Sequence, residues 1–437
     1  MVLRLIFTDL RLDIWRWLGP LVVITAASAV TLFFVSAIAT VVNLETPQSG
    51  VAQGILVLIF FNGASAIIVL NSVTNLSVAI NDRAYALWQL AGIEPAAIRM
   101  IVTSQLLILS LVGSLAGCAI MSPLIQPLYD LFTSSKSLEV LAAKTAFGVD
   151  SIILVVVGIA VIVLVSGMRG ARRAARIPAI EALREPTLPR ARMGRLSSTI
   201  AIGSLALASI LVNAMFSGAN ITLFALLLGP VIAAIFTSAA PLLFAKFVRA
   251  WTSLVPERMS AAWYLAKHAA RFKVSQTTAA VSPLMIGVAL TGSLSTVFAT
   301  SGSAAPIEYV GLLLGAPLLL TTIGVAATIF LTSYSRDREL ALIRASGSTD
   351  ATIIAIAALE AIIHVVTAVL LGLVIVLAVG TTYAGAMSTH HPGVIPIFDL
   401  SSVGVVGIAG LVLVVMATVI PTAVALRHDV PNLLVAD

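Results

Sequence analysis

Long apolar runs recur along the whole chain, and short polar segments separate them. We place ten such runs, each of roughly 20 residues or more, at 18–42, 53–80, 98–122, 149–168, 198–216, 221–245, 279–300, 308–334, 352–380 and 402–425. A helix of ~20 apolar residues spans a hydrocarbon core of ~30 Å, whereas strands of a membrane barrel show ~10 residues of alternating polarity. The pattern therefore predicts an all-α polytopic membrane protein with ten transmembrane helices.

The composition supports this prediction and excludes several other classes of protein. Of the 437 residues, 59% are hydrophobic and only 10% are charged, against about 25% charged residues in soluble domains. This excludes a soluble enzyme, a disordered scaffold and a nucleic-acid-binding protein. The first run, 18–42, is longer than the ~7–15 apolar residues of a secretory signal peptide, so we interpret it as the first span.

The basic residues are distributed unequally between the two sets of connecting segments. Of the 25 Lys and Arg residues, only Lys136 and Lys144 fall in the presumed outer set. The positive-inside rule then places both termini in the cytoplasm, and the excess of Arg over Lys, with abundant Ala, favours a bacterial plasma membrane. The outer connections, at 43–52, 123–148, 217–220, 301–307 and 381–401, are too short for an independently folded domain.

One segment of the chain occurs twice. Residues 82–92 align without gaps on residues 337–347, at an offset of 255, and five of the eleven positions are identical. Each copy follows the second helix of a four-helix group, which predicts two parallel repeats joined by a two-helix bridge, a 4+2+4 arrangement. The expected domains are a first repeat, a cytoplasmic linker, the bridge and a second repeat, at 1–183, 184–197, 198–250 and 251–437.

Both copies share a local pattern of a short charged helix, a glycine and a helix start. Pro95 suits the first turn of the next helix in one copy, and Thr349 suits the N-cap in the other, with Asp350 favourable to the helix dipole. We expect a rigid elbow at the cytoplasmic face, with an apolar knob formed by Tyr85 and Trp88 beside the Asp-Arg pair. A membrane-interface loop anchored by aromatic side chains and positive charge is the alternative.

The second copy, Arg336 to Gly347, running into Ala358-Leu359-Glu360-Ala361, resembles the signature of FtsX-like permeases in the MacB-type ABC transporter superfamily. The segment Arg172 to Leu183 resembles the family's ending after its fourth helix, and His428-Asp429-Val430-Pro431 is a weaker second copy. Amphipathic segments around Leu3 to Trp17 and Ala261 to Phe272 also fit. The resemblance covers both four-helix groups, about two thirds of the chain.

The resemblance implies a non-hydrolysing membrane subunit whose elbows dock onto a dimer of ABC ATPases. Because the chain has no Gly-x-x-x-x-Gly-Lys-Ser/Thr sequence, ATP and Mg²⁺ are expected on a separate ATPase, and the chain itself is not an enzyme. The expected ATPase-coupling residues are Asp82, Arg83, Tyr85, Leu87, Trp88, Gly92, Asp337, Arg338, Glu339, Leu340, Leu342, Ile343 and Gly347.

The spans also contain polar residues, which are costly inside a bilayer. Glu360 has His364 one turn further along the same helix face, and Gln105 occupies the position of Glu360 in the first repeat. A hydrogen bond that ties helices together and a proton- or substrate-sensing role both remain open. Interhelical hydrogen bonds are expected for Asn62, Asn71 and Asn75. No cluster of ligands predicts a metal site.

Three functions are compatible with the sequence. The first is a permease that exports or extracts a hydrophobic or amphipathic compound, such as an antimicrobial peptide, a lipid or a drug, because the large extracytoplasmic domain of many relatives is missing. The second is an ATP-driven signalling or mechanotransmitting subunit that regulates a partner. The third is a secondary transporter or intramembrane enzyme, which Glu360 alone supports. Expected partners are the ATPase dimer, lipid, the substrate and a second permease or small accessory protein.

Overall fold

The computed structural model describes residues 14–42, 49–133, 148–174, 195–218, 220–256, 260–272, 274–302, 307–333, 344 and 347–426. Regular secondary structure in this part of the chain is entirely helical. The helices are α2 (Ile14–Val42), α3 (Ser49–Ile80), α4 (Asp82–Leu90), α5 (Pro95–Met121), η1 (Ser122–Leu124), α6 (Ile125–Thr133), α7 (Val149–Ala174), α9 (Arg195–Phe216), α10 (Ile221–Ser238), α11 (Ala240–Thr252), α12 (Ala261–Phe272), α13 (Val274–Ser301), α14 (Ile307–Ser333), α16 (Asp350–Ser388) and α17 (Leu400–Ala425).

Most of these helices are long and apolar enough to cross a membrane. Within the described residues, nine stretches meet that condition: Trp17–Thr40, Ile59–Ile80, Pro95–Asp130, Val149–Arg172, Ser197–Phe216, Ile221–Ser238, Val281–Ser301, Asp350–Ser388 and Leu400–Val424. The run at 308–334 corresponds to α14, which contributes a shorter apolar stretch, Pro317–Ile329. The prediction of a polytopic α-helical membrane protein is confirmed, and the count of ten spans stays a prediction.

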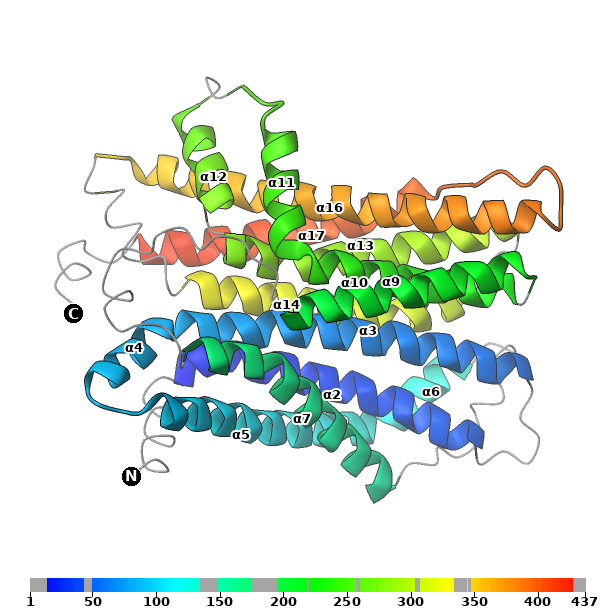
Figure 1. The fold of residues 1–437 in the computed structure, drawn as a ribbon, viewed down its shortest axis with the longest axis horizontal. Coiled ribbons are helices and arrows are strands. Elements are labelled where there is room, and N and C mark those ends of the chain that lie inside the picture. The colour runs from blue at the N-terminus through cyan, green and yellow to red at the C-terminus, as the bar shows by residue number, and fades with distance from the viewer. Residues whose placement is uncertain are drawn as a thin grey trace.

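The long helices lie side by side in one bundle (Figure 1). In the first group α2 packs against α3 and α5, and α7 packs against α5; in the second group α13 packs against α14 and α16, and α17 packs against α16. Between the groups, α2 contacts α14, and α3 contacts both α13 and α14. The two groups therefore use equivalent pairings. Helix α10 contacts α3, α13 and α16, whereas α9 packs mainly on α10.

Small residues set the closest helix contacts. A Cβ atom added at Gly117 of α5 would overlap the hydroxyl of Ser28 and the carbonyl of Thr25 on α2. Gly372 of α16, 255 residues further on, meets α13 in the same way, and its added Cβ would lie 2.5 Å from a methyl group of Val288. Membrane helices associate through close packing of this kind because lipid gives no hydrophobic drive between them.

The structure corrects one predicted span. The run 221–245 is not one helix, because α10 ends at Ser238 and α11 turns away from the bundle (Figure 1). Pro241 explains the break. It has no N–H to donate to the carbonyl four residues earlier, so the α-helix cannot continue through it unchanged.

Two predicted outer connections are also partly helical. Helix α16 continues to Ser388, eight residues beyond the expected end at 380, and the segment after α5 continues as η1 and α6. The next helix, α17, begins after Asp399, whose carboxylate accepts hydrogen bonds from the hydroxyls of Ser401 and Ser402, each at 2.5 Å. These bonds hold the pKa of Asp399 below its usual value.

The packing at Gly117 predicts a specific loss of stability. In Gly117→Ala the new methyl group meets α2 backbone, and overpacking of this kind costs about 1–3 kcal/mol. Gly158→Ala on α7 is the matched control, because nothing lies within 4 Å of its added Cβ. We expect the melting temperature of the purified protein in detergent to fall for Gly117→Ala and to stay level or rise for Gly158→Ala. Equal melting temperatures for the two variants would contradict this account.

Candidate functional site

The first copy of the repeated segment forms a short helix at one end of the bundle. Helix α4 follows α3 across the single residue Asn81 and contacts α3, α5 and α7. Figure 1 shows it beyond the end of α3, where the chain reverses toward α5. We call this end of the bundle the elbow end. The reversal is tight because only residues 91–94 connect the two helices.

The reversal at the end of α4 depends on Gly92. This glycine has φ +88°, in the left-handed region that side chains disfavour. Its N–H donates to the carbonyl of Gln89 at 3.0 Å, and the N–H of Ile93 donates to that of Trp88 at 3.0 Å, which together form a Schellman motif. Pro95 then starts α5, as predicted from its residue type.

The second copy closes with the same turn. Gly347 has φ +91°, and its N–H donates to the carbonyl of Arg344 at 3.0 Å, so both values match those of Gly92 at the 255-residue offset. The predicted N-cap is confirmed, since Thr349 Oγ1 accepts a hydrogen bond from the N–H of Thr352 at 3.3 Å. Pro95 and Asp350, the first residues of α5 and α16, are also 255 positions apart.

The exposed surface of α4 differs from the expected knob. Tyr85 is only 1% exposed, and the ring of Trp88 packs on it at a centroid distance of 5.5 Å. The exposed apolar side chains are Leu87 at 48% and Leu90 at 52%. Tyr85 therefore holds α4 to the bundle, because a helix turns successive side chains by ~100° and directs Leu87 to the opposite face. The expected exposure of Tyr85 is wrong.

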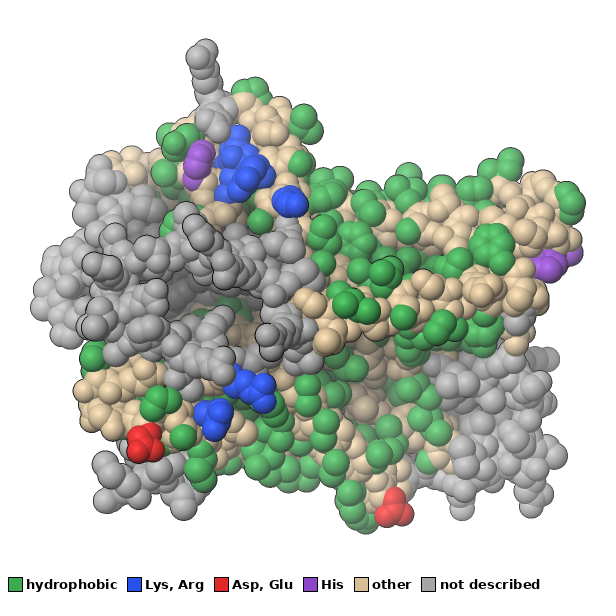
Figure 2. Space-filling view, viewed as in Figure 1, with side chains coloured by type: hydrophobic (Ala, Val, Ile, Leu, Met, Phe, Trp, Pro, Cys, Tyr) green, Lys and Arg blue, Asp and Glu red, His purple; other side chains and the backbone are tan. Residues whose placement is uncertain are grey.

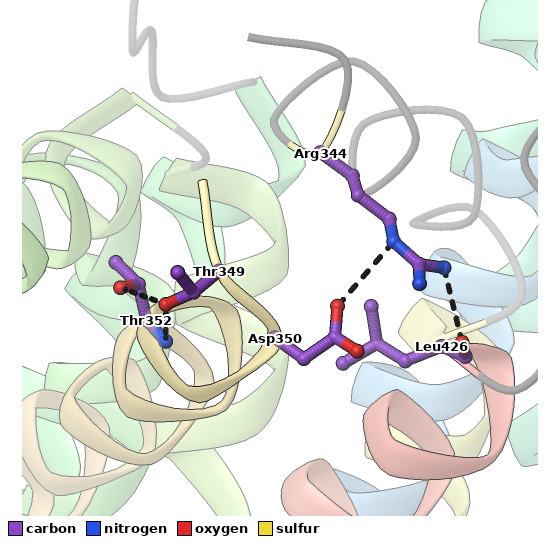
Figure 3. A network of polar contacts seen from close by, with 5 residues as sticks. All are labelled: Arg344, Thr349, Asp350, Thr352 and Leu426. Atoms are coloured by element: carbon purple, nitrogen blue, oxygen red, sulfur yellow. Dashed lines mark hydrogen bonds and ion pairs between the residues drawn. The ribbon is translucent and has the colours of Figure 1, made fainter. Parts of the chain in front are cut away.

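Arg344 joins the second elbow to two spans. Its Nε lies 3.3 Å from Oδ1 of Asp350 at the start of α16, and its Nη1 donates to the carbonyl of Leu426 at the end of α17, at 3.1 Å (Figure 3). Arg344 is not among the predicted coupling residues. Its position six residues before Asp350 indicates an ion pair only weakly. Leu426 is 82 residues away in the sequence, so only the fold brings its carbonyl close to Arg344.

The remaining coupling residues divide into two sets. Asp82 and Arg83 are in α4, and only their backbone is described. The others of the second copy lie outside the described residues: Asp337, Arg338, Glu339, Leu340, Leu342 and Ile343.

The predicted polar residues of the spans are buried or partly buried. Gln105, Glu360 and His364 are all buried, Gln105 on α5 and the other two on α16. Asn62 of α3 is buried as well. Asn75 Nδ2 donates to Asn71 Oδ1 at 2.8 Å and to its carbonyl at 2.7 Å. Those two bonds stay within α3, so they are not the predicted interhelical hydrogen bonds.

Lys267 is a second buried charge, on the helix α12 that packs against the α16 helix of Glu360. Lys267 of α12, 3% exposed, is next to Ala266, and Ala266 shares an apolar cluster with Ile356 and Ile363 of α16. Those two isoleucines flank Glu360, itself 5% exposed, on the helix that α12 packs against. Because an uncompensated buried charge is strongly destabilising, we expect these two side chains to neutralise each other.

An apolar groove separates parts of the two helix groups near the elbow end. It has a volume of about 1110 Å³ and is bounded by the first turns of α2, the second half of α14 and the second half of α17. Its lining is Leu18, Gly19, Val22, Ile323, Ala326, Ala327, Ala409, Val412, Leu413, Met416, Ala417, Ile420 and Pro421. Every one of these side chains is apolar, so the groove suits a hydrocarbon group.

Comparison with known proteins identifies part of the chain. Residues 311–430, which include the second elbow, match the family FtsX-like permease C-terminal. No curated protein matches the chain. The family match supports the FtsX-like permease family and indicates an integral membrane permease component of an ABC-type system. FtsX-like permeases generally work with an ABC ATPase.

The burial of Glu360 and Lys267 leads to a double-mutant test. Glu360→Gln and Lys267→Gln each leave one buried charge without compensation, and breaking a buried pair costs about 3–5 kcal/mol. We expect both single variants to lower the melting temperature strongly and the double variant to recover much of the loss. Arg99→Gln, which removes an exposed charge on α5, serves as the control. Additive losses would show that the two charges are independent.

Proposed function

We propose that this chain is the membrane subunit of an ATP-driven ABC transporter and that residues 82–92 and 337–347 are its ATPase-coupling segments. The match of 311–430 to an FtsX-like permease supports the general assignment. The observation that carries the proposal is the pair of glycine turns at Gly92 and Gly347, which share a positive φ of about 90° and the same N–H bond to the carbonyl three residues earlier. A glycine turn repeated at the same place in both halves supports the same task in both halves.

The surface of the first elbow supports a protein partner. Leu87 and Leu90 are exposed on a helix that lies at the end of the bundle, where the long apolar spans have already ended (Figure 1). Apolar side chains grouped in such a position mark an interaction site. Two elbows fit two ATPase subunits, and ATP and Mg²⁺ would be bound there. With no P-loop in the sequence, this chain would transmit the motion of the ATPase without hydrolysing ATP.

Arg344 would carry such motion into the membrane. It contacts the first residue of α16 and the last turn of α17, so a displacement of the second elbow would act on both spans. Both helices belong to the second group, and α17 lines the apolar groove. Movement of the elbow would therefore change the width of the groove.

The groove supports a substrate with a hydrocarbon group. A volume of about 1110 Å³ is slightly above the range of small-molecule pockets, about 300–1,000 Å³. Such a site fits the acyl chains of a lipid, a lipopeptide or an apolar drug taken directly from the bilayer. We propose export or extraction of such a compound, toward the side of the membrane opposite the elbows.

The elbow surface provides the test. The chain is co-expressed with the ABC ATPase encoded beside it, and the variant Leu87→Ser/Leu90→Ser is combined with Asp337→Ala/Arg338→Ala. We expect this variant to lose co-purification of the ATPase and at least tenfold of the ATP hydrolysis that the complex supports. The matched control is Ile395→Ser, an exposed apolar side chain in the connection before α17. An ATPase that stays bound and stimulated in the elbow variant would overturn the proposal.

A further inference from the structure

Helices α11 and α12 form a hairpin that leaves the bundle sideways (Figure 1). We call residues 240–272 the lateral hairpin. Its root lies toward the elbow end for a topological reason. The turn before α10 contains Gly218, whose added Cβ would touch the ring of His390, just after α16 has ended. Since α16 starts at the elbow end, α10 runs back toward that end before α11 begins.

The lateral hairpin is fixed to the bundle. Trp251 Nε1 donates a hydrogen bond to Thr367 Oγ1 of α16 at 3.0 Å. An apolar cluster of Val248, Trp263 and Ala270 with Ile356 and Ile363 of α16 fills the contact. The hairpin therefore has a set orientation relative to the spans.

Contacts inside the lateral hairpin hold its two helices together. Arg271 Nη2 donates to the carbonyl of Arg249 at 3.1 Å and to Thr252 Oγ1 at 2.8 Å. This cation caps the last carbonyls of α11, where the helix dipole favours positive charge. The ring centroids of Trp251 and Trp263 lie 6.4 Å apart across the hairpin.

The outer surface of the lateral hairpin combines cations with apolar and aromatic groups. Lys246, Arg249 and His268 are exposed, and Figure 2 shows Lys, Arg and His side chains gathered on the projecting hairpin. The exposed apolar and aromatic side chains are Leu254, Tyr264, Leu265 and Phe272. The described residues of the hairpin include no Asp or Glu. The surface thus carries positive charge beside side chains that avoid water.

We propose that the lateral hairpin lies along the membrane surface at the elbow end and binds the headgroups of anionic lipids. Each Lys or Arg near an anionic bilayer surface contributes about 1 kcal/mol to binding, and aromatic side chains favour the headgroup level. Amphipathic helices with basic and apolar groups bind in the plane of the interface. The hairpin has this composition and leaves the bundle sideways, as an interfacial element requires.

This inference goes beyond ATP coupling, because it assigns a lipid-binding role to a surface distant from α4. The attachment to α16 through Thr367, Ile356 and Ile363 gives lipid binding a route to the spans. Anionic lipid would hold the hairpin in place and thereby stabilise α16, which begins at the Gly347 turn.

Thermal unfolding with defined lipids tests the proposal. The full chain in detergent is mixed with phosphatidylglycerol or with phosphatidylcholine. We expect phosphatidylglycerol to raise the melting temperature more, because a ligand of the folded state stabilises it, and 0.5 M NaCl to reduce the difference. Lys246→Gln/Arg249→Gln should lose at least half of the phosphatidylglycerol effect. Arg99→Gln/Arg172→Gln, which removes two exposed charges on α5 and α7, should keep it.

Two results would overturn the proposal. One is an equal effect of the two lipids on the wild type; the other is an unchanged phosphatidylglycerol effect in Lys246→Gln/Arg249→Gln. A fluorophore on Leu265→Cys, in a Cys118→Ala background, gives a second measurement in nanodiscs. We expect quenching by headgroup-labelled phosphatidylglycerol. Absence of quenching, together with protection of the fluorophore by the ATPase, would identify a protein surface instead.

Discussion

The lack of water in the hydrocarbon core is the constraint on which the rest of the structure depends. Every backbone N–H and C=O inside the bilayer must find a partner within the protein, so the spans are helices. Many hydroxyls of the spans find their partner within their own helix. Ser28 donates to the carbonyl of Ile24 at 2.8 Å and Thr367 to that of Ile363 at 2.6 Å, each within its own helix. Where a hydroxyl is satisfied in its own helix, the contact between helices can rest on glycine and close packing, as at Gly117 and Gly372.

The same constraint explains where chemistry is placed. Among the residues that the structure describes, buried charge is confined to a few positions, and Glu360 and Lys267 lie on helices that pack together. Irregular backbone is found at the ends of the bundle, where water can reach it, and the two glycine turns are at the elbow end. The elbows therefore combine a backbone geometry that only glycine adopts easily with a position outside the apolar spans. This combination suits a surface that receives force from a soluble partner and passes it to α16 and α17 through Arg344.

The amino-acid sequence predicts the local features well. Apolar runs predict the helices, and the pattern of Gly92, Pro95 and Thr349 predicts the turn and both helix starts. Features that depend on distant parts of the chain were not predictable. The burial of Tyr85, the bond from Arg344 to Leu426 and the sideways course of α11 each depend on which helices become neighbours. Pro241 is a local feature that could have predicted the break in 221–245. The uninterrupted apolar run around it favoured a single span instead. Gly117 and Gly372 are 255 residues apart, which is the offset of the repeat. Once the contact of Gly117 with α2 is known, the offset therefore predicts an equivalent contact at Gly372.

The composition of the intact complex tests the central claim most directly. The chain is purified together with its ABC ATPase, and native mass spectrometry measures the number of each subunit. Two elbows on one chain predict one copy of this protein with two ATPase subunits. A complex with two copies of this chain, a complex with a single ATPase subunit, or a chain that purifies alone would contradict the account.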